Sequence, residues 1–173
     1  MTSPQKAKGG GFERQIATFL TDLYGEKFIR TPGSGAYVGG SNSKRKEFLH
    51  EGQIRSFKGD IIPGQSFPKL NAECKFYKDF PFHQFFTGSI KILDLWIAQC
   101  MEAADSGDFN ILFMKFNRKG TYVAVHHSDT TSFNLKNHFI YTHQTHGSWI
   151  IMDHQTFFET NSKQVKQLCS SQS

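Results

Sequence analysis

The chain has 173 residues, a formal net charge of +5 and a pI near 9.1. This length suits one domain with tails, because two independent hydrophobic cores would be cramped within it. Ten of the 20 Lys and Arg residues lie within residues 1–60, and a concentration of positive charge favours a polyanionic partner such as nucleic acid. Since Phe supplies 18 residues, much of the core is expected to be aromatic.

The composition also argues against several classes of protein. Three cysteines without a CxxC pair or zinc-ligand spacing do not make a disulfide framework, and they favour a reducing compartment. No apolar run approaches the roughly 18 residues of a membrane span. The N-terminal MTSPQKAKGGG lacks the apolar core of a signal peptide. We therefore expect a cytoplasmic protein with no membrane partner.

The N-terminal third predicts a flexible segment, a helix and a basic loop. Residues 1–11 are polar, basic and glycine-rich, which is typical of flexible chain. From Phe12, apolar residues recur at helical spacing up to a stop signal at Gly25. The segments that follow are an extended stretch at 27–31, a turn at 32–35 and a basic loop or hairpin at 41–59.

The rest of the chain alternates between predicted strands and helices. Residues 60–63 and 70–76 are expected to form a β-hairpin across the turn GQSFPK. The later elements are a long helix at 82–104, strands at 110–116, 122–126, 139–143 and 148–153, and a terminal helix at 153–168. This order predicts an α/β fold with a mixed central β-sheet flanked by helices. We expect residues 128–173 to extend the core and to end in disorder.

The chemistry centres on three residues near the predicted hairpin. Glu73 and Lys75 lie two apart on one strand, so their side chains share a face while Cys74 points to the opposite layer. Asp60 opens the preceding strand, and the hairpin can bring its carboxylate close to Glu73. Two hard oxygen ligands suit Mg²⁺, for which Mn²⁺ can substitute. A lysine beside them can orient or deprotonate a water for phosphodiester cleavage.

Glu13, near the start of the first helix, can add a third carboxylate, directly or through a water, if that helix packs over the hairpin. Apolar neighbours such as Ile61, Ile62 and Ala72 indicate that the acids lie on a largely buried hairpin, where unpaired charges are costly without a function. The sequence therefore predicts a divalent-metal site that handles phosphates.

These residues resemble the archaeal-type Holliday junction resolvases and their phage relatives, within the PD-(D/E)xK nuclease superfamily. The resemblance runs from about Gly10 to His126 and is carried by GGGFERQIATFL, FIRTPGSGA, KGDII, NAECKF, and DLWIAQCMEAA with NILFMKFNRKGTYVAV. Gly59 stands where the superfamily name has proline. The resemblance implies a restriction-endonuclease-like core over residues 12–127, and it is compatible with a phage-encoded protein that acts in the host cytosol.

The resemblance also implies roles for single residues. Glu13, Asp60 and Glu73 would bind metal together with the backbone carbonyl of Cys74, and Lys75 would be catalytic. Arg30 and Ser34 would contact the scissile region, and Gln99 would be an auxiliary helix residue. The expected DNA contacts are Arg14, Arg30, Ser34, Lys44, Arg45, Lys46, Arg55 and Lys58.

The expected function is Mg²⁺-dependent cleavage of branched DNA, four-way junctions above all, by a homodimer whose twofold symmetry matches that of the junction. Two alternatives stay open: a restriction-like or nicking nuclease on duplex DNA, and a non-catalytic DNA-binding module. Histidine pairs such as His143 and His146 have no cysteine partners nearby, so ordinary histidines are favoured over zinc ligands.

Overall fold

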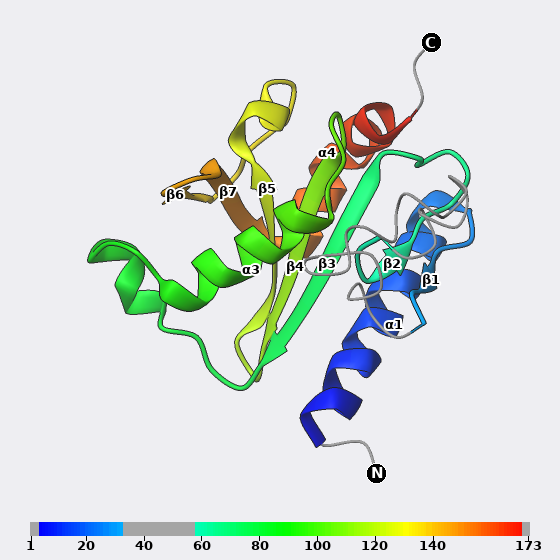
Figure 1. The fold of residues 1–173 in the computed structure, drawn as a ribbon. Coiled ribbons are helices and arrows are strands. Elements are labelled where there is room, and N and C mark those ends of the chain that lie inside the picture. The colour runs from blue at the N-terminus through cyan, green and yellow to red at the C-terminus, as the bar shows by residue number, and fades with distance from the viewer. Residues whose placement is uncertain (1–3, 33–57, 171–173) are drawn as a thin grey trace.

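The computed structural model describes residues 4–32 and 58–170. Its larger sheet is mixed, with helices on both faces (Figure 1), which confirms the predicted fold class. The helices are α1 (Pro4–Tyr24), η2 (Phe82–Phe86), α3 (Lys91–Ala103), η3 (His127–Thr130) and α4 (His154–Cys169). The strands are β1 (Ile29–Arg30), β2 (Ile61–Ile62), β3 (Leu70–Tyr77), β4 (Phe109–Phe116), β5 (Gly120–His126), β6 (Phe139–His143) and β7 (Gly147–Asp153).

The larger sheet has five strands in the order β3-β4-β5-β7-β6. β3 and β4 run parallel, as a crossover through α3 requires, and every other pairing in this sheet is antiparallel. β3 is therefore an edge strand, and its outer side faces α1 and the short pair β1–β2 (Figure 1). This open edge is where the predicted catalytic residues lie.

Side chains of alternate strand residues build two hydrophobic cores, one on each face of the sheet. Phe12 and Ile16 of α1 and Phe157 of α4 pack on one face, together with Ala72 and Cys74 of β3. Trp96 and Ile97 of α3 pack on the other, with Leu112 and Met114 of β4 and with Trp149 of β7. Both tryptophans are fully buried. Aromatic residues supply much of both cores, in line with the high Phe content.

Three sequence-based expectations are wrong in detail. Residues 4–11 are helical, because α1 begins at Pro4 and not at Phe12. The predicted helix over 82–104 is broken between η2 and α3, where Gly88 takes a φ of 131° that a helix cannot accommodate. β2 pairs with β1 and not with β3, so residues 60–76 do not form the expected hairpin ladder.

None of the helices in the described part of the chain has the length and apolar character that a membrane span needs.

Candidate active site

Asp60 is fixed at the edge of β3 by its own backbone and by its side chain. Its N–H donates to the Ala72 carbonyl (2.8 Å), and its carbonyl accepts from the Thr31 N–H (2.9 Å). Its carboxylate Oδ2 accepts from the backbone N–H of Cys74 (2.8 Å). The residue is only 4% exposed. The expected closeness of Asp60 to the Glu73 strand is thus achieved by hydrogen bonds to Ala72 and Cys74 and not by a hairpin ladder.

Glu73 and Lys75 leave β3 on the face covered by α3, whereas Cys74 enters the core on the opposite face, as predicted. The Lys75 ammonium Nζ donates to Glu73 Oε1 at 2.7 Å. Both side chains are mostly buried, with 17% and 12% of their surfaces exposed. The lysine is therefore held beside the carboxylate and does not reach into solvent.

Burial and neighbouring charges shift the pKa values of Asp60 and Lys75. Burial, and next the Glu73 carboxylate, raise the pKa of Asp60 to about 7, against the lowering effect of the Cys74 N–H. Burial acts to lower the pKa of Lys75, but attraction to Glu73 outweighs it and the pKa is raised. Lys75 therefore stays protonated near neutral pH, which suits orienting a water or stabilising negative charge better than removing a proton.

The raised pKa of Asp60 predicts an unusual pH dependence of stability without metal. Because the folded chain holds a proton on Asp60 between pH 3.8 and about 7 that the unfolded chain has lost, stability should fall as the pH rises through this window. In EDTA we expect the melting temperature at pH 8 to lie on the order of 5 °C below that at pH 5. Thermal melts should show this decline to be much smaller in Asp60→Asn and to be reversed by Mg²⁺. An equal decline in Asp60→Asn would contradict the assignment.

Glu13 lies on α1, facing the site from the other side of the β3 edge. Its carboxylate pairs with the guanidinium Nε of Arg30 on β1, and it contributes a smaller part of the rise in the pKa of Asp60. No group of three or more His, Cys, Asp and Glu side chains within residues 4–32 and 58–170 lies close enough together to hold a metal ion. The three predicted carboxylates are thus neighbours but not a direct three-ligand cluster.

Asp60 and Glu73 fit a divalent cation on chemical grounds. Two carboxylates that repel each other at a buried edge are stabilised by a cation between them, and hard oxygen ligands suit Mg²⁺. The Cys74 carbonyl fits as well, because the N–H and C=O of one strand residue point to the same side, and the Cys74 N–H already points at Asp60. The residues present therefore match the predicted donor set apart from Glu13.

Asn71 supports the catalytic strand and was not predicted from the sequence. It is fully buried, and its amide Nδ2 donates to the Cys100 carbonyl on α3 and to Asn110 Oδ1 on β4, both at 2.8 Å. These bonds tie the start of β3 to α3 and β4 two residues before Glu73. An amide inside the apolar run of a predicted strand is the signal that could have identified it.

The other predicted site residues, apart from Lys58, are either exposed or lie outside the described part of the chain. Arg14 is exposed on α1, where it is available to DNA, and Gln99 is exposed on α3. Five predicted contacts lie outside the described residues: Ser34, Lys44, Arg45, Lys46 and Arg55. The roles of all of these residues remain predictions.

The prediction for Lys58 is wrong. It was expected to contact DNA, but it is 6% exposed and its ammonium pairs with Asp108 and, at 3.0 Å, with Asp105. Its partners lie about 50 residues further along the chain, so no local sequence pattern indicates the pairing. Lys58 instead fastens the chain just before Gly59 and Asp60 to the α3–β4 connection.

Replacing Lys58 should therefore destabilise the fold. In Lys58→Met the Asp108 side chain, 7% exposed, loses a buried partner, and breaking such a pair costs about 3 kcal/mol. Urea unfolding should show this loss, and Lys58→Met/Asp108→Asn should recover part of it. Lys163→Met, at an exposed position on α4, is the matched control. A loss no larger than in the control would show that the pair does not stabilise the fold.

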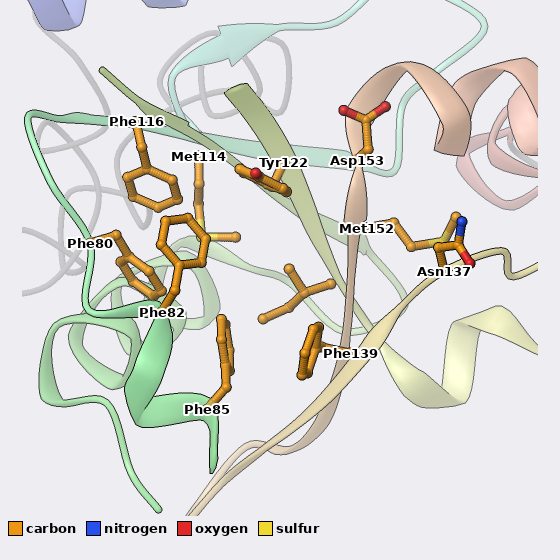
Figure 2. A pocket seen from close by; sticks show the side chains of 11 residues that line it. Phe80, Phe82, Phe85, Met114, Phe116, Tyr122, Asn137, Phe139, Met152 and Asp153 are labelled. Atoms are coloured by element: carbon orange, nitrogen blue, oxygen red, sulfur yellow. The ribbon is translucent and has the colours of Figure 1, made fainter. Parts of the chain in front are cut away.

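A cavity of about 270 Å³ lies on the face of the sheet that carries α3. Figure 2 shows rings from η2 (Phe82, Phe85), β4 (Phe116) and β6 (Phe139) gathered around it. Its one acidic lining residue, Asp153, instead caps α4 by accepting from the Thr156 N–H (3.0 Å). The rest of the lining is mostly aromatic and aliphatic, so the β3 edge, which holds two carboxylates and a lysine, is the candidate active site.

Comparison with known proteins points to a nuclease family. A family model described as "Phage putative PDDEXK endonuclease" matches residues 4–172. No curated protein and no solved structure gives a significant match. The matched range includes α1, Asp60, β3 and the C-terminal helix α4.

Proposed function

The chain belongs to the phage PDDEXK endonuclease family, and we propose that it is a Mg²⁺-dependent endonuclease that cuts branched DNA, with four-way junctions as its preferred substrate. The observation that carries the proposal is the edge of β3, where the Asp60 and Glu73 carboxylates repel each other beside a protonated Lys75. This arrangement of charge complements a divalent cation and a phosphate.

Each residue has a distinct task in the proposed reaction. Asp60, Glu73 and the Cys74 carbonyl would hold Mg²⁺, and Mn²⁺ would substitute. The bound ion supplies Lewis-acid stabilisation of the phosphate and activation of a water. The Cys74 N–H keeps the Asp60 carboxylate in place, and Lys75, held by Glu73, brings positive charge to where negative charge develops. Glu13 would position Arg30 near the scissile phosphate through their ion pair.

Two considerations support a homodimer on four-way junctions. The order of the helix glutamate, the R-x-P-x-S-G stretch, GD and ExK resembles junction resolvases. A twofold dimer would also place two identical sites on opposing strands of a twofold junction. Recognition would rest on backbone and shape, with exposed basic residues such as Arg14 as contacts. The reaction would then take place in the host cytosol.

The test is cleavage of a labelled immobile four-way junction beside a linear duplex of the same sequence, with Mg²⁺, with Mn²⁺ and with EDTA. We expect paired nicks, confined to the junction and dependent on the metal. Equal cutting of the linear duplex would support the assigned active site but contradict the junction preference, and the protein would then be a duplex nuclease. Tight junction binding without cutting would favour a non-catalytic module. Size-exclusion chromatography with light scattering tests the dimer.

A further inference from the structure

The carboxyl ends of β3 and β4 bring basic side chains together beside the catalytic strand. The two parallel strands end in register at Tyr77 and Phe116, and the Asn117 N–H donates to the Tyr77 carbonyl (3.1 Å). Lys78 follows β3 directly, and Arg118 lies in the β4–β5 turn. Both strand ends lie at the bottom of the sheet in Figure 1. Positive charge from two separate segments therefore meets at one end of the sheet.

This cluster lies within reach of the substrate bound at Lys75. Lys78 is three residues further along the chain, which at about 3.3 Å per residue is about 10 Å away. A DNA strand rises 3.4 Å per nucleotide, so this spacing corresponds to roughly three nucleotides. The cluster can therefore contact phosphates within about three nucleotides of the cut.

Arg118 has a conformation that its packing does not explain. The turn is closed by the Lys119 N–H donating to the Phe116 carbonyl (3.1 Å), and Arg118 takes a φ of 58° in it, where Gly or Asn is favoured. Its side chain is exposed and has no hydrogen-bond or ion-pair partner within the described part of the chain. Lys119, by contrast, pairs with Asp79. An exposed arginine with a strained backbone and no partner is better explained by binding a ligand than by stabilising the fold.

Tyr77 places an aromatic ring between this cluster and the catalytic lysine. It shares a face of β3 with Glu73 and Lys75, since all three are alternate residues. Its ring packs against Trp96 of α3, with centroids 4.8 Å apart, yet the residue is 41% exposed. A ring held from one side and open on the other can stack on an unpaired base.

We propose that the end of β3 and the β4–β5 turn bind one DNA strand beside the cut, with Lys78 and Arg118 on phosphates and Tyr77 stacked on an unpaired base. The proposal rests on the proposed nuclease function and narrows its substrate to DNA with unpaired or unstacked bases next to the scissile phosphate. Branch points supply such bases, and continuous duplex does not.

The phosphate contacts are tested by salt-dependent binding of a fluorescein-labelled four-way junction in the Glu73→Gln background. Each phosphate contact contributes about 0.9 to the slope of log K against log salt, so Lys78→Ala/Arg118→Ala should lower that slope by roughly 2. Lys136→Ala/Lys163→Ala, at two exposed lysines elsewhere on the molecule, should leave it unchanged. Arg118→Gly adds a check on folding, because it removes the charge and relieves the strain. It should melt no lower than its parent but bind more weakly.

The base contact is tested with 2-aminopurine at the branch point. Tyr77→Ala should abolish the quenching of its fluorescence and weaken junction binding roughly tenfold. Tyr77→Phe keeps the ring and should retain both. If the wild type cuts DNA but these variants keep the parental slope and quenching, the proposed strand contact is wrong and the nuclease function stands. If the wild type neither binds nor cuts DNA, both proposals are wrong.

Discussion

Asp60→Asn and Glu73→Gln should each reduce DNA cleavage by roughly 1000-fold or more while leaving junction binding intact or stronger. Each substitution removes one of the two carboxylates that fit a divalent cation at the edge of β3, and a lost ligand costs several kcal/mol of transition-state stabilisation. Each also removes a negative charge from beside the bound phosphates, which favours binding. Single-turnover cleavage and fluorescence anisotropy on the same junction measure the two effects separately.

The structure provides a test of whether these variants fold. An asparagine at 60 can still accept the Cys74 N–H, and it removes a buried charge whose ionisation is opposed by burial and by Glu73. Asp60→Asn should therefore melt no lower than wild type in EDTA at pH 8. Glu159→Gln, at an exposed position on α4, should keep wild-type cleavage. Wild-type cleavage rates in either site variant would show that the metal site has been assigned to the wrong residues.

The arrangement of Glu73, Cys74 and Lys75 was predictable from the sequence because it is local to one strand. Glu73, Cys74 and Lys75 follow the two-residue period of a strand, so the pattern alone places Cys74 opposite the other two. The same periodicity located β4, β5, β6 and β7 to within two residues at each end. Patterns of this kind identify a strand but not its partner, which is why the predicted hairpin was wrong and β2 pairs with β1.

Features that depend on distant partners were not predictable. Lys58 has the sequence context of a basic loop, and only the folded chain brings Asp108 to it. Arg30 was expected to face DNA, and its pairing with Glu13 joins two elements that no spacing rule connects. The proposed strand contact is of the same kind, because Lys78 and Arg118 lie 40 residues apart and meet only through the parallel register of β3 and β4.

Among the uncharged residues of the site, Gly59 is the one whose replacement should be most damaging. It precedes Asp60 with a φ of 63°, which the fixed φ of proline cannot match, so this backbone could not hold the proline of the superfamily name at position 59. A Cβ at this position would lie 2.6 Å from the Ala72 carbonyl oxygen and 2.9 Å from Asn71 Oδ1. Both neighbours are held in place by hydrogen bonds of β3, and neither can move away easily.

Gly59→Ala should therefore cost about 3 kcal/mol, with contributions from the left-handed φ and from the clash with the backbone. It should also reduce cleavage strongly, because the Asp60 N–H bond to Ala72 shares the displaced carbonyl. Gly25→Ala is the matched control, since Gly25 has a φ of 68° with no atom within 4 Å of an added Cβ, so it carries only the conformational strain. Urea unfolding and junction cleavage of the two variants separate the two contributions. Equal losses in both variants would mean that the close approach to β3 does not position Asp60.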